Sequence, residues 1–212
     1  MTNAAHPAMP GPPEPVPLSV WPCAPDPPAA RGTPPVPVLL LQRLIAVYSH
    51  PATVVLAAGA DASRIADVAI DLGRRPVIDP AGHPRPFPAV GATRAALIIA
   101  TPPAVTCDPA RYTRWARALT PTGILTVLTP ALHGTGALLP GRVVTAARAA
   151  GLAYLQHIIA MRAHLHGDHL VAAPTRDDLA QAATAQAAGM PVHRTAHTDV
   201  LVFTAPDFEV PA

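Results

Sequence analysis

Apolar runs and amphipathic stretches alternate along this chain. Residues 53–56 form a short β-branched run, a loop of small residues covers 57–60, and apolar residues then recur at helical spacing over 65–72 until Gly73. A second short apolar run ends at Asp79. The order of strand, loop, helix and strand predicts a βαβ unit, which starts most parallel α/β sheets. Ligands of such sheets bind where the loop leaves the first strand.

The same patterns extend over the rest of the chain. Pro37 opens a helix that runs to about residue 48, because its fixed φ suits a first helical turn. Residues 95–100 are a continuous apolar run, typical of a strand buried on both faces. Further elements are a helix opened by Asp108-Pro109, a strand over 124–128, a helix over 141–150, strands over 152–162 and 170–173, a helix from Thr175 to Gly189 and a last strand over 200–204. Six or seven strands interleaved with helices indicate an α/β domain with antiparallel pairing only near the C-terminus.

Proline divides the chain into a tail and a domain. Residues 1–36 hold 12 of the 29 prolines, which excludes a helix and removes the donors that a sheet needs. We therefore expect an extended or disordered tail over 1–36, in which 18–21 is the apolar stretch suited to docking. A linker or tail is favoured over a ligand for a proline-binding partner. The domain then spans 37–206, and 207–212 is a C-terminal tail.

Composition narrows the function classes only slightly. Half of the 212 residues are apolar but 4% are aromatic, so the core is expected to be lean. All 15 basic residues are Arg, and a net charge of +2 creates no field that favours nucleic acid. Cys23 and Cys107 form no disulfide pattern, and neither a secretory signal nor an apolar run of about 18 residues is present. These features predict a cytoplasmic protein without a membrane segment.

Three passages in order resemble one family. They are the stretch over 48–75 with its Tyr-Ser-His-Pro start and Leu-Gly-Arg-Arg end, the Thr-Pro-Pro-Ala over 101–104, and the Leu-Thr-Pro-Thr-Gly-Ile-Leu over 119–125. The chain resembles the S-adenosylmethionine-dependent methyltransferase fold and, within it, the amino-group (N4-cytosine/N6-adenine) DNA methyltransferases. The resemblance implies a Rossmann-like α/β sandwich, mostly parallel with an antiparallel C-terminal edge. Because only residues 76–94 are available between the first helix and the strand that ends in Thr-Pro-Pro, the sheet is expected to be shortened there.

The resemblance also implies where S-adenosylmethionine binds. Ala57 takes the position of the family's acidic residue, Asp61 takes a glycine position, and Gly59 stays as a turn residue. Asp61 is either the N-cap of the following helix, which is favoured, or a group that touches the cofactor. Asp79 is either the acceptor for the ribose hydroxyls or the start of an ordinary Asp-Pro turn. The cofactor residues that we expect are therefore Ala57, Gly59, Asp61 and Asp79.

The catalytic residues that the resemblance implies are Thr101, Pro102 and Pro103. In the family, a side-chain oxygen and the first proline's carbonyl accept the hydrogens of an exocyclic amine and orient its lone pair, while an aromatic residue stacks on the flipped base. Ala104 offers no such stacking face. The alternative is that Thr-Pro-Pro only ends a strand, because a proline pair ends sheet pairing.

The function that follows is methyl transfer to a base amine of DNA or RNA. The alternative is a catalytically inactive relative that keeps the fold as a binding or regulatory module. Arg111, Arg114 and Arg117 either bind phosphates or form a solvated helix face, and the solvated face is favoured. Histidines beside a turn at 167–168 are interpreted as exposed polar residues, so no metal is predicted.

Overall fold

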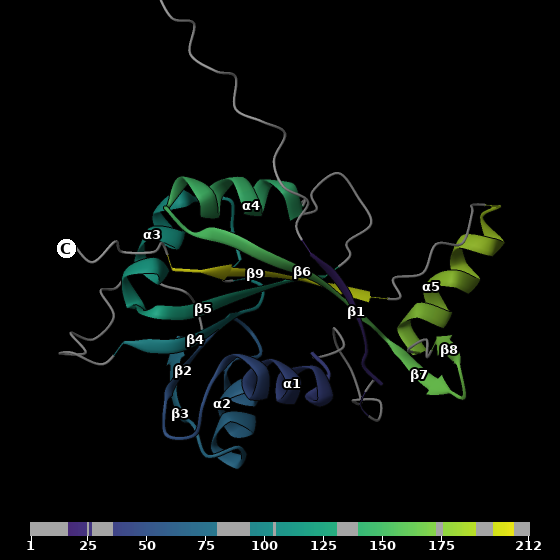
Figure 1. The fold of residues 1–212 in the computed structure, drawn as a ribbon. Coiled ribbons are helices and arrows are strands. Elements are labelled where there is room, and N and C mark those ends of the chain that lie inside the picture. The colour runs from purple at the N-terminus through teal and green to yellow at the C-terminus, as the bar shows by residue number, and fades with distance from the viewer. Residues whose placement is uncertain are drawn as a thin grey trace, which may run out of the picture.

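The computed structural model describes residues 17–24, 26, 36–79, 94–103, 105–130, 140–172, 176–189 and 197–205. Within these residues, seven strands form one sheet in the order β1-β6-β9-β5-β4-β2-β3 (Figure 1). They are β1 (Leu18–Pro22), β2 (Val54–Ala58), β3 (Arg75–Asp79), β4 (Ala95–Ala100), β5 (Leu119–Pro130), β6 (Ala153–Met161) and β9 (His197–Thr204). All neighbours pair in parallel except β9, which is antiparallel to β5 and β6.

Helices cover both faces of this sheet (Figure 1). One face packs against α1 (Val38–Tyr48) and α2 (Ala62–Asp71), and the other packs against α3 (Pro109–Ala118) and α4 (Pro140–Ala149). The hairpin of β7 (Ala163–His166) and β8 (His169–Ala172) and the helix α5 (Arg176–Ala187) lie outside the sheet. The predicted α/β sandwich with a mostly parallel sheet is therefore confirmed.

The order in which the chain adds strands to the sheet reverses between β3 and β4. The chain moves outward from β2 to β3 and then returns to place β4 on the opposite side of β2. Ala58 consequently pairs with both Asp79 and Ala100. The carboxyl ends of β2 and β4 thus meet at a topological switch point, where open α/β sheets bind their ligands.

The antiparallel strand does not lie where the sequence predicted it. β9 is an interior strand between β5 and β6, and not the edge of the sheet. All four residues of its Val200-Leu201-Val202-Phe203 run are fully buried. A strand that is covered on both faces needs such a continuous apolar run, so the run itself indicated an interior position.

The edge next to β6 is formed by a segment that we had assigned to the proline-rich tail. β1 pairs with β6 from Leu18 opposite His157 to Pro22 opposite Met161. Gln156 of β6 holds it further: the amide nitrogen donates to Ser19 Oγ at 2.6 Å, and the amide oxygen accepts from Tyr48 Oη at 2.9 Å. The apolar stretch at 18–21 therefore docks on the domain as a strand of its sheet.

Two other differences concern short elements. The expected strand over 152–162 ends at Met161, and a separate hairpin, β7 and β8, follows it. The expected strand over 124–128 begins earlier, because residues 119–123 also belong to β5, in which the pairing jumps from Ala95 opposite Leu119 to Leu97 opposite Ile124. On the other side of the sheet β3 is the last described strand, as expected for a shortened sheet. Residues 80–93 lie outside the described residues.

Trp115 of α3 is the largest fully buried side chain and stacks edge-on against Tyr112, with ring centroids 5.4 Å apart. Trp115→Ala is expected to lower the free energy of unfolding by about 3–5 kcal/mol, because it removes buried area and leaves a cavity. Ile70→Ala, at a position that is 59% exposed, is the control and should change it by less than about 0.5 kcal/mol. Equal losses in urea denaturation would contradict this packing.

Candidate functional site

The loop after β2 and the Thr-Pro-Pro corner after β4 are in direct contact. The amide of Thr101 donates to the carbonyl of Ala58 at 2.8 Å, and the amide of Ala60 donates to the carbonyl of Pro102 at 2.9 Å. The amide of Asp61 donates to Thr101 Oγ1 at 3.3 Å. The structure therefore brings together two of the parts that the sequence placed at the site.

The N–H groups of this loop are used within the chain. Gly59 donates to the carbonyl of Asp79 at 3.2 Å, and Ala62 donates to the carbonyl of Gly59 at 3.2 Å. With the bonds of Ala60 and Asp61 given above, four consecutive N–H groups have partners in the protein. A ligand in this loop would have to replace one of these bonds to receive a hydrogen bond from the backbone.

Gly59 is required by the corner. Its φ is +106°, and a Cβ atom at this position would lie 2.0 Å from the carbonyl oxygen of Thr101. Only glycine permits both the backbone conformation and this approach. The space that the missing side chain leaves is therefore filled by Thr101 itself.

The polar atoms of the Thr-Pro-Pro corner form hydrogen bonds within the protein. Thr101 is fully buried, and its hydroxyl donates to the carbonyl of Ala58 at 3.2 Å while it accepts from Asp61. The carbonyl of Pro102 accepts from Ala60, and Pro103, which follows through a cis peptide bond, is exposed. These contacts are those of a corner that ends β4 and fixes the neighbouring loop. The catalytic role of Thr101, Pro102 and Pro103 stays a prediction, and Ala104 lies outside the described residues.

The remaining predicted cofactor residues differ in access. Asp79 ends β3, is partly exposed, and pairs with Ala58 immediately before Gly59. Its carboxylate is thus at the carboxyl edge of the sheet, where it can accept hydrogen bonds from hydroxyl groups. Ala57 is fully buried in the core beneath α1 and α2, so its methyl group faces protein.

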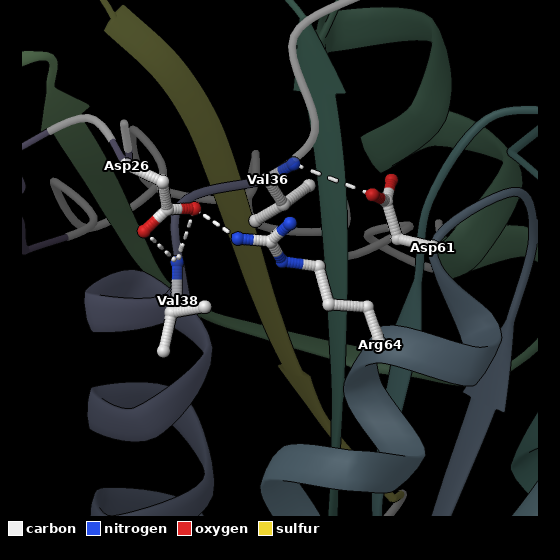
Figure 2. Close-up of polar contacts among 5 residues, drawn as sticks. All are labelled: Asp26, Val36, Val38, Asp61 and Arg64. Atoms are coloured by element: carbon white, nitrogen blue, oxygen red, sulfur yellow. Dashed lines mark hydrogen bonds and ion pairs between the residues drawn. The ribbon is translucent and has the colours of Figure 1, made fainter. Parts of the chain in front are cut away.

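Asp61 lies at the start of α2, as one of the two interpretations predicted, and its contact with the cofactor stays a prediction. It occupies the N-cap position of α2, but its side chain makes no capping hydrogen bond. Its Oδ1 atom instead accepts from the amide of Val36 at 3.3 Å, which fastens the segment before α1 to the start of α2 (Figure 2). One oxygen of this carboxylate therefore holds the segment before α1 in place and does not cap the helix.

A second carboxylate, Asp26, completes this attachment. Both of its oxygens lie 3.2 Å from the amide of Val38, and one of them pairs with Arg64 Nη2 on α2 (Figure 2). The first turn of α1 contains no acidic residue, so Asp26 supplies the negative charge that a helix N-terminus favours. We call Asp26, Val36, Val38, Asp61 and Arg64 the N-terminal clamp. Sequence analysis missed it because the partners are far apart in the chain and no local pattern links them.

The segment after the corner is fixed from α3. Tyr112 Oη donates to the carbonyl of Thr106 at 2.7 Å. Burial raises the pKa of Tyr112, with a smaller contribution from the charge of Cys107, so the hydroxyl stays a neutral donor. Asp108 Oδ1 accepts from Ala110 at 2.9 Å, which confirms the predicted helix start.

A cleft of about 250 Å³ lies between α3 and α4, lined by Cys107, Pro109, Arg142, Thr145, Ala146 and Ala149.

Neither a metal site nor a membrane helix is found in the described part of the chain. No group of three or more His, Cys, Asp or Glu side chains there is arranged to hold a metal ion. Its helices are all too short or too polar to cross a bilayer.

Comparison with known proteins identifies the fold. No protein-family model and no curated protein matches the sequence. Among solved structures, the chain is similar to the 1,6-didemethyltoxoflavin-N1-methyltransferase of Burkholderia thailandensis with bound S-adenosylhomocysteine, at a TM-score of 0.50 and 16% identity over 80% of this chain and 78% of that one. A TehB-like S-adenosylmethionine-dependent methyltransferase from Corynebacterium glutamicum matches at a TM-score of 0.45 and 16% identity, over 78% and 86% of the two chains.

These comparisons concern the fold of the chain. At such low identity the likeness concerns the fold alone, and the fold is the Rossmann-like α/β sandwich of S-adenosylmethionine-dependent methyltransferases. The N-methyltransferase NodS from Bradyrhizobium japonicum is another similar structure, with a TM-score of 0.47 and 13% identity over 80% of this chain and 94% of that one.

Gly59→Ala tests the contact between loop and corner. The left-handed φ costs about 1–2 kcal/mol for any other residue, and the overlap with Thr101 adds to that cost. Gly73→Ala is the matched control, because Gly73 also has a positive φ of +75° but has no atom within 4 Å of the added Cβ. Urea denaturation should show the larger loss of stability for Gly59→Ala. Equal losses would mean that the corner does not pack against Gly59.

The N-terminal clamp predicts unequal effects of its two charged partners. Asp26→Ala removes the acceptor of the Val38 amide and should cost about 1 kcal/mol, as the loss of a helix cap does. Arg64→Ala removes only a partly exposed ion pair and should cost less than that, within about 0.2–1 kcal/mol. The free energies of unfolding of both variants decide this, and a larger loss for Arg64→Ala would refute the capping role of Asp26.

Proposed function

We propose that this chain is an S-adenosylmethionine-dependent methyltransferase-like protein that binds its cofactor at the carboxyl ends of β2 and β3. In this proposal the carboxylate of Asp79 accepts hydrogen bonds from the ribose hydroxyls, and the backbone turn at Gly59 lies beside it. The bound cofactor would supply an activated methyl group.

One observation carries the proposal most directly. The strand order reverses between β3 and β4. In open α/β sheets, ligands bind at the carboxyl ends of the strands beside such a reversal, here β2 and its neighbours. Asp79 is a partly exposed carboxylate at this edge of the sheet. The similar enzyme from Burkholderia thailandensis, whose structure contains S-adenosylhomocysteine, supports the choice of ligand.

The methyl acceptor that the sequence resemblance favours is an exocyclic amine of a DNA or RNA base. This part of the proposal needs Thr101 and Pro102 to accept hydrogens from the amine. Both groups already accept a hydrogen bond from the loop after β2, and Thr101 is fully buried, so the corner would have to open before a base could reach the Thr101 hydroxyl. The +2 net charge gives no general attraction to nucleic acid.

A binding or regulatory module without catalysis is the second candidate. The observation that favours it is the full burial of Thr101 together with its two hydrogen bonds to Ala58 and Asp61. Methyl transfer from labelled S-adenosylmethionine to DNA and RNA distinguishes the two functions. Transfer that Thr101→Ala abolishes would support the base-methylating enzyme.

Calorimetry with S-adenosylhomocysteine tests the cofactor site. Asp79→Ala should weaken binding about 10- to 100-fold, because hydrogen bonds to a charged acceptor contribute about 1.5–3 kcal/mol. Asp67→Ala, on an exposed position of α2, is the control and should bind like the parent. Equal affinity of the two variants would remove Asp79 from the site. If the parent chain shows no binding at millimolar ligand, the cofactor proposal is wrong.

A further inference from the structure

The backbone of β1 has a partner strand on one side only among the described residues. β1 lies at the end of the sheet beside β6 (Figure 1). The carbonyl of Pro17 accepts from the amide of His157 at 3.0 Å, which directs the backbone groups of the odd-numbered residues toward β6. The N–H and C=O groups of Leu18 and Val20 therefore point away from the sheet.

The end of β1 limits how far a further strand could pair with it. Pro22 also faces outward, but it has no N–H group, and its carbonyl accepts from Arg43 Nη1 at 2.8 Å. Within the described residues, the outer edge of β1 therefore offers the two donors and two acceptors of Leu18 and Val20 to another strand.

This set of backbone groups is complementary to itself. In an antiparallel strand pair, two opposing residues whose backbone groups face each other exchange two hydrogen bonds. A second β1, related by a two-fold axis that passes between the two Ser19 residues, places Leu18 opposite Val20 of the second copy and Val20 opposite its Leu18. The two pairs then form four hydrogen bonds, which use every donor and acceptor of the two free edges.

The side chains on this edge suit the same arrangement. Leu18 is 61% exposed and Val20 is 53% exposed, and alternate residues of a strand lie on the same face of the sheet. In the antiparallel pair, each Leu18 lies beside Val20 of the other copy, with Cβ atoms about 4.5–5.5 Å apart. Four exposed apolar side chains would thus cover one another.

The opposite edge of the sheet is protected against such pairing. On β3, Pro76 and Ile78 face outward, because the amide of Arg75 donates to β2 at 2.9 Å. Pro76 has no N–H group, and the strand begins and ends with a charged residue. Proline and charge are the usual means by which an edge strand resists pairing. β1 has neither of them over residues 18–21.

We propose that the edge of β1 is the contact surface between two copies of this chain, which pair antiparallel over residues 18–20 so that their two sheets become one. The same edge serves in both copies, so the contact closes at a dimer. Each copy contributes one short strand, and the dimer therefore dissociates on dilution. This assembly does not depend on the proposed function.

Sedimentation velocity of the full chain over a series of concentrations tests the dimer, and it should show a reversible equilibrium between monomer and dimer. Leu18→Lys combined with Val20→Lys should weaken the dimer at least about tenfold, because like charges replace the apolar contacts between the copies. Both side chains are exposed, so the fold tolerates the change. Ile78→Lys, at a position on β3 that is 48% exposed, is the matched control and should dimerise like the parent.

Disulfide cross-linking tests the register of the two strands. Ser19→Cys places two thiols at the two-fold axis, where opposing Cα atoms lie about 4.5 Å apart, within the range of a disulfide. Leu18→Cys is the control at a more exposed position, because its two thiols would lie on a diagonal about 7–8 Å apart. Under mild oxidation, Ser19→Cys should form the linked dimer at least several-fold faster. The parent chain, with Cys23 and Cys107, gives the background rate.

Three results would each overturn the inference. They are a parent chain that stays monomeric at every concentration, a dimer that the two lysine substitutions leave intact, and equal rates of cross-linking at the two cysteine positions. The first of these results would leave the β1 edge to a strand of another protein.

Discussion

The structure depends on the contact between the loop after β2 and the corner after β4. Because Gly59 has no side chain, the carbonyl of Thr101 occupies the position that a Cβ atom would take, and four hydrogen bonds join the two segments. This contact lies at the switch point of the sheet, which in such folds is left to a ligand. The same few backbone atoms therefore determine both the stability of the fold and the access of a ligand.

Much of the fold was readable from the sequence because its signals are local. The βαβ pattern over 53–79 and the Asp108-Pro109 helix start each specify structure within a few residues, and the structure has β2, α2, β3 and α3 in these places. The continuous apolar run of β9 was also visible. Its interior position was missed because a run shows burial on both faces but does not identify the neighbouring strands.

The candidate site was less predictable because its residues act through distant partners. Sequence position suggested that Asp61 caps a helix or meets a cofactor, whereas its carboxylate bonds to the amide of Val36. Asp26 and Arg64 are 38 residues apart in the chain and meet only in the folded structure.

The position of β1 has a consequence for how the chain is made. Leu18 is synthesised before His157, and its strand can pair only after His157 and its neighbours on β6 exist. Pairing between such distant segments forms late, since the entropy of closing the long loop is lost before the contacts form. β1 is thus expected to be among the last of the described strands to join the sheet, and it stays without its partner strand while the residues between β1 and β6 are synthesised.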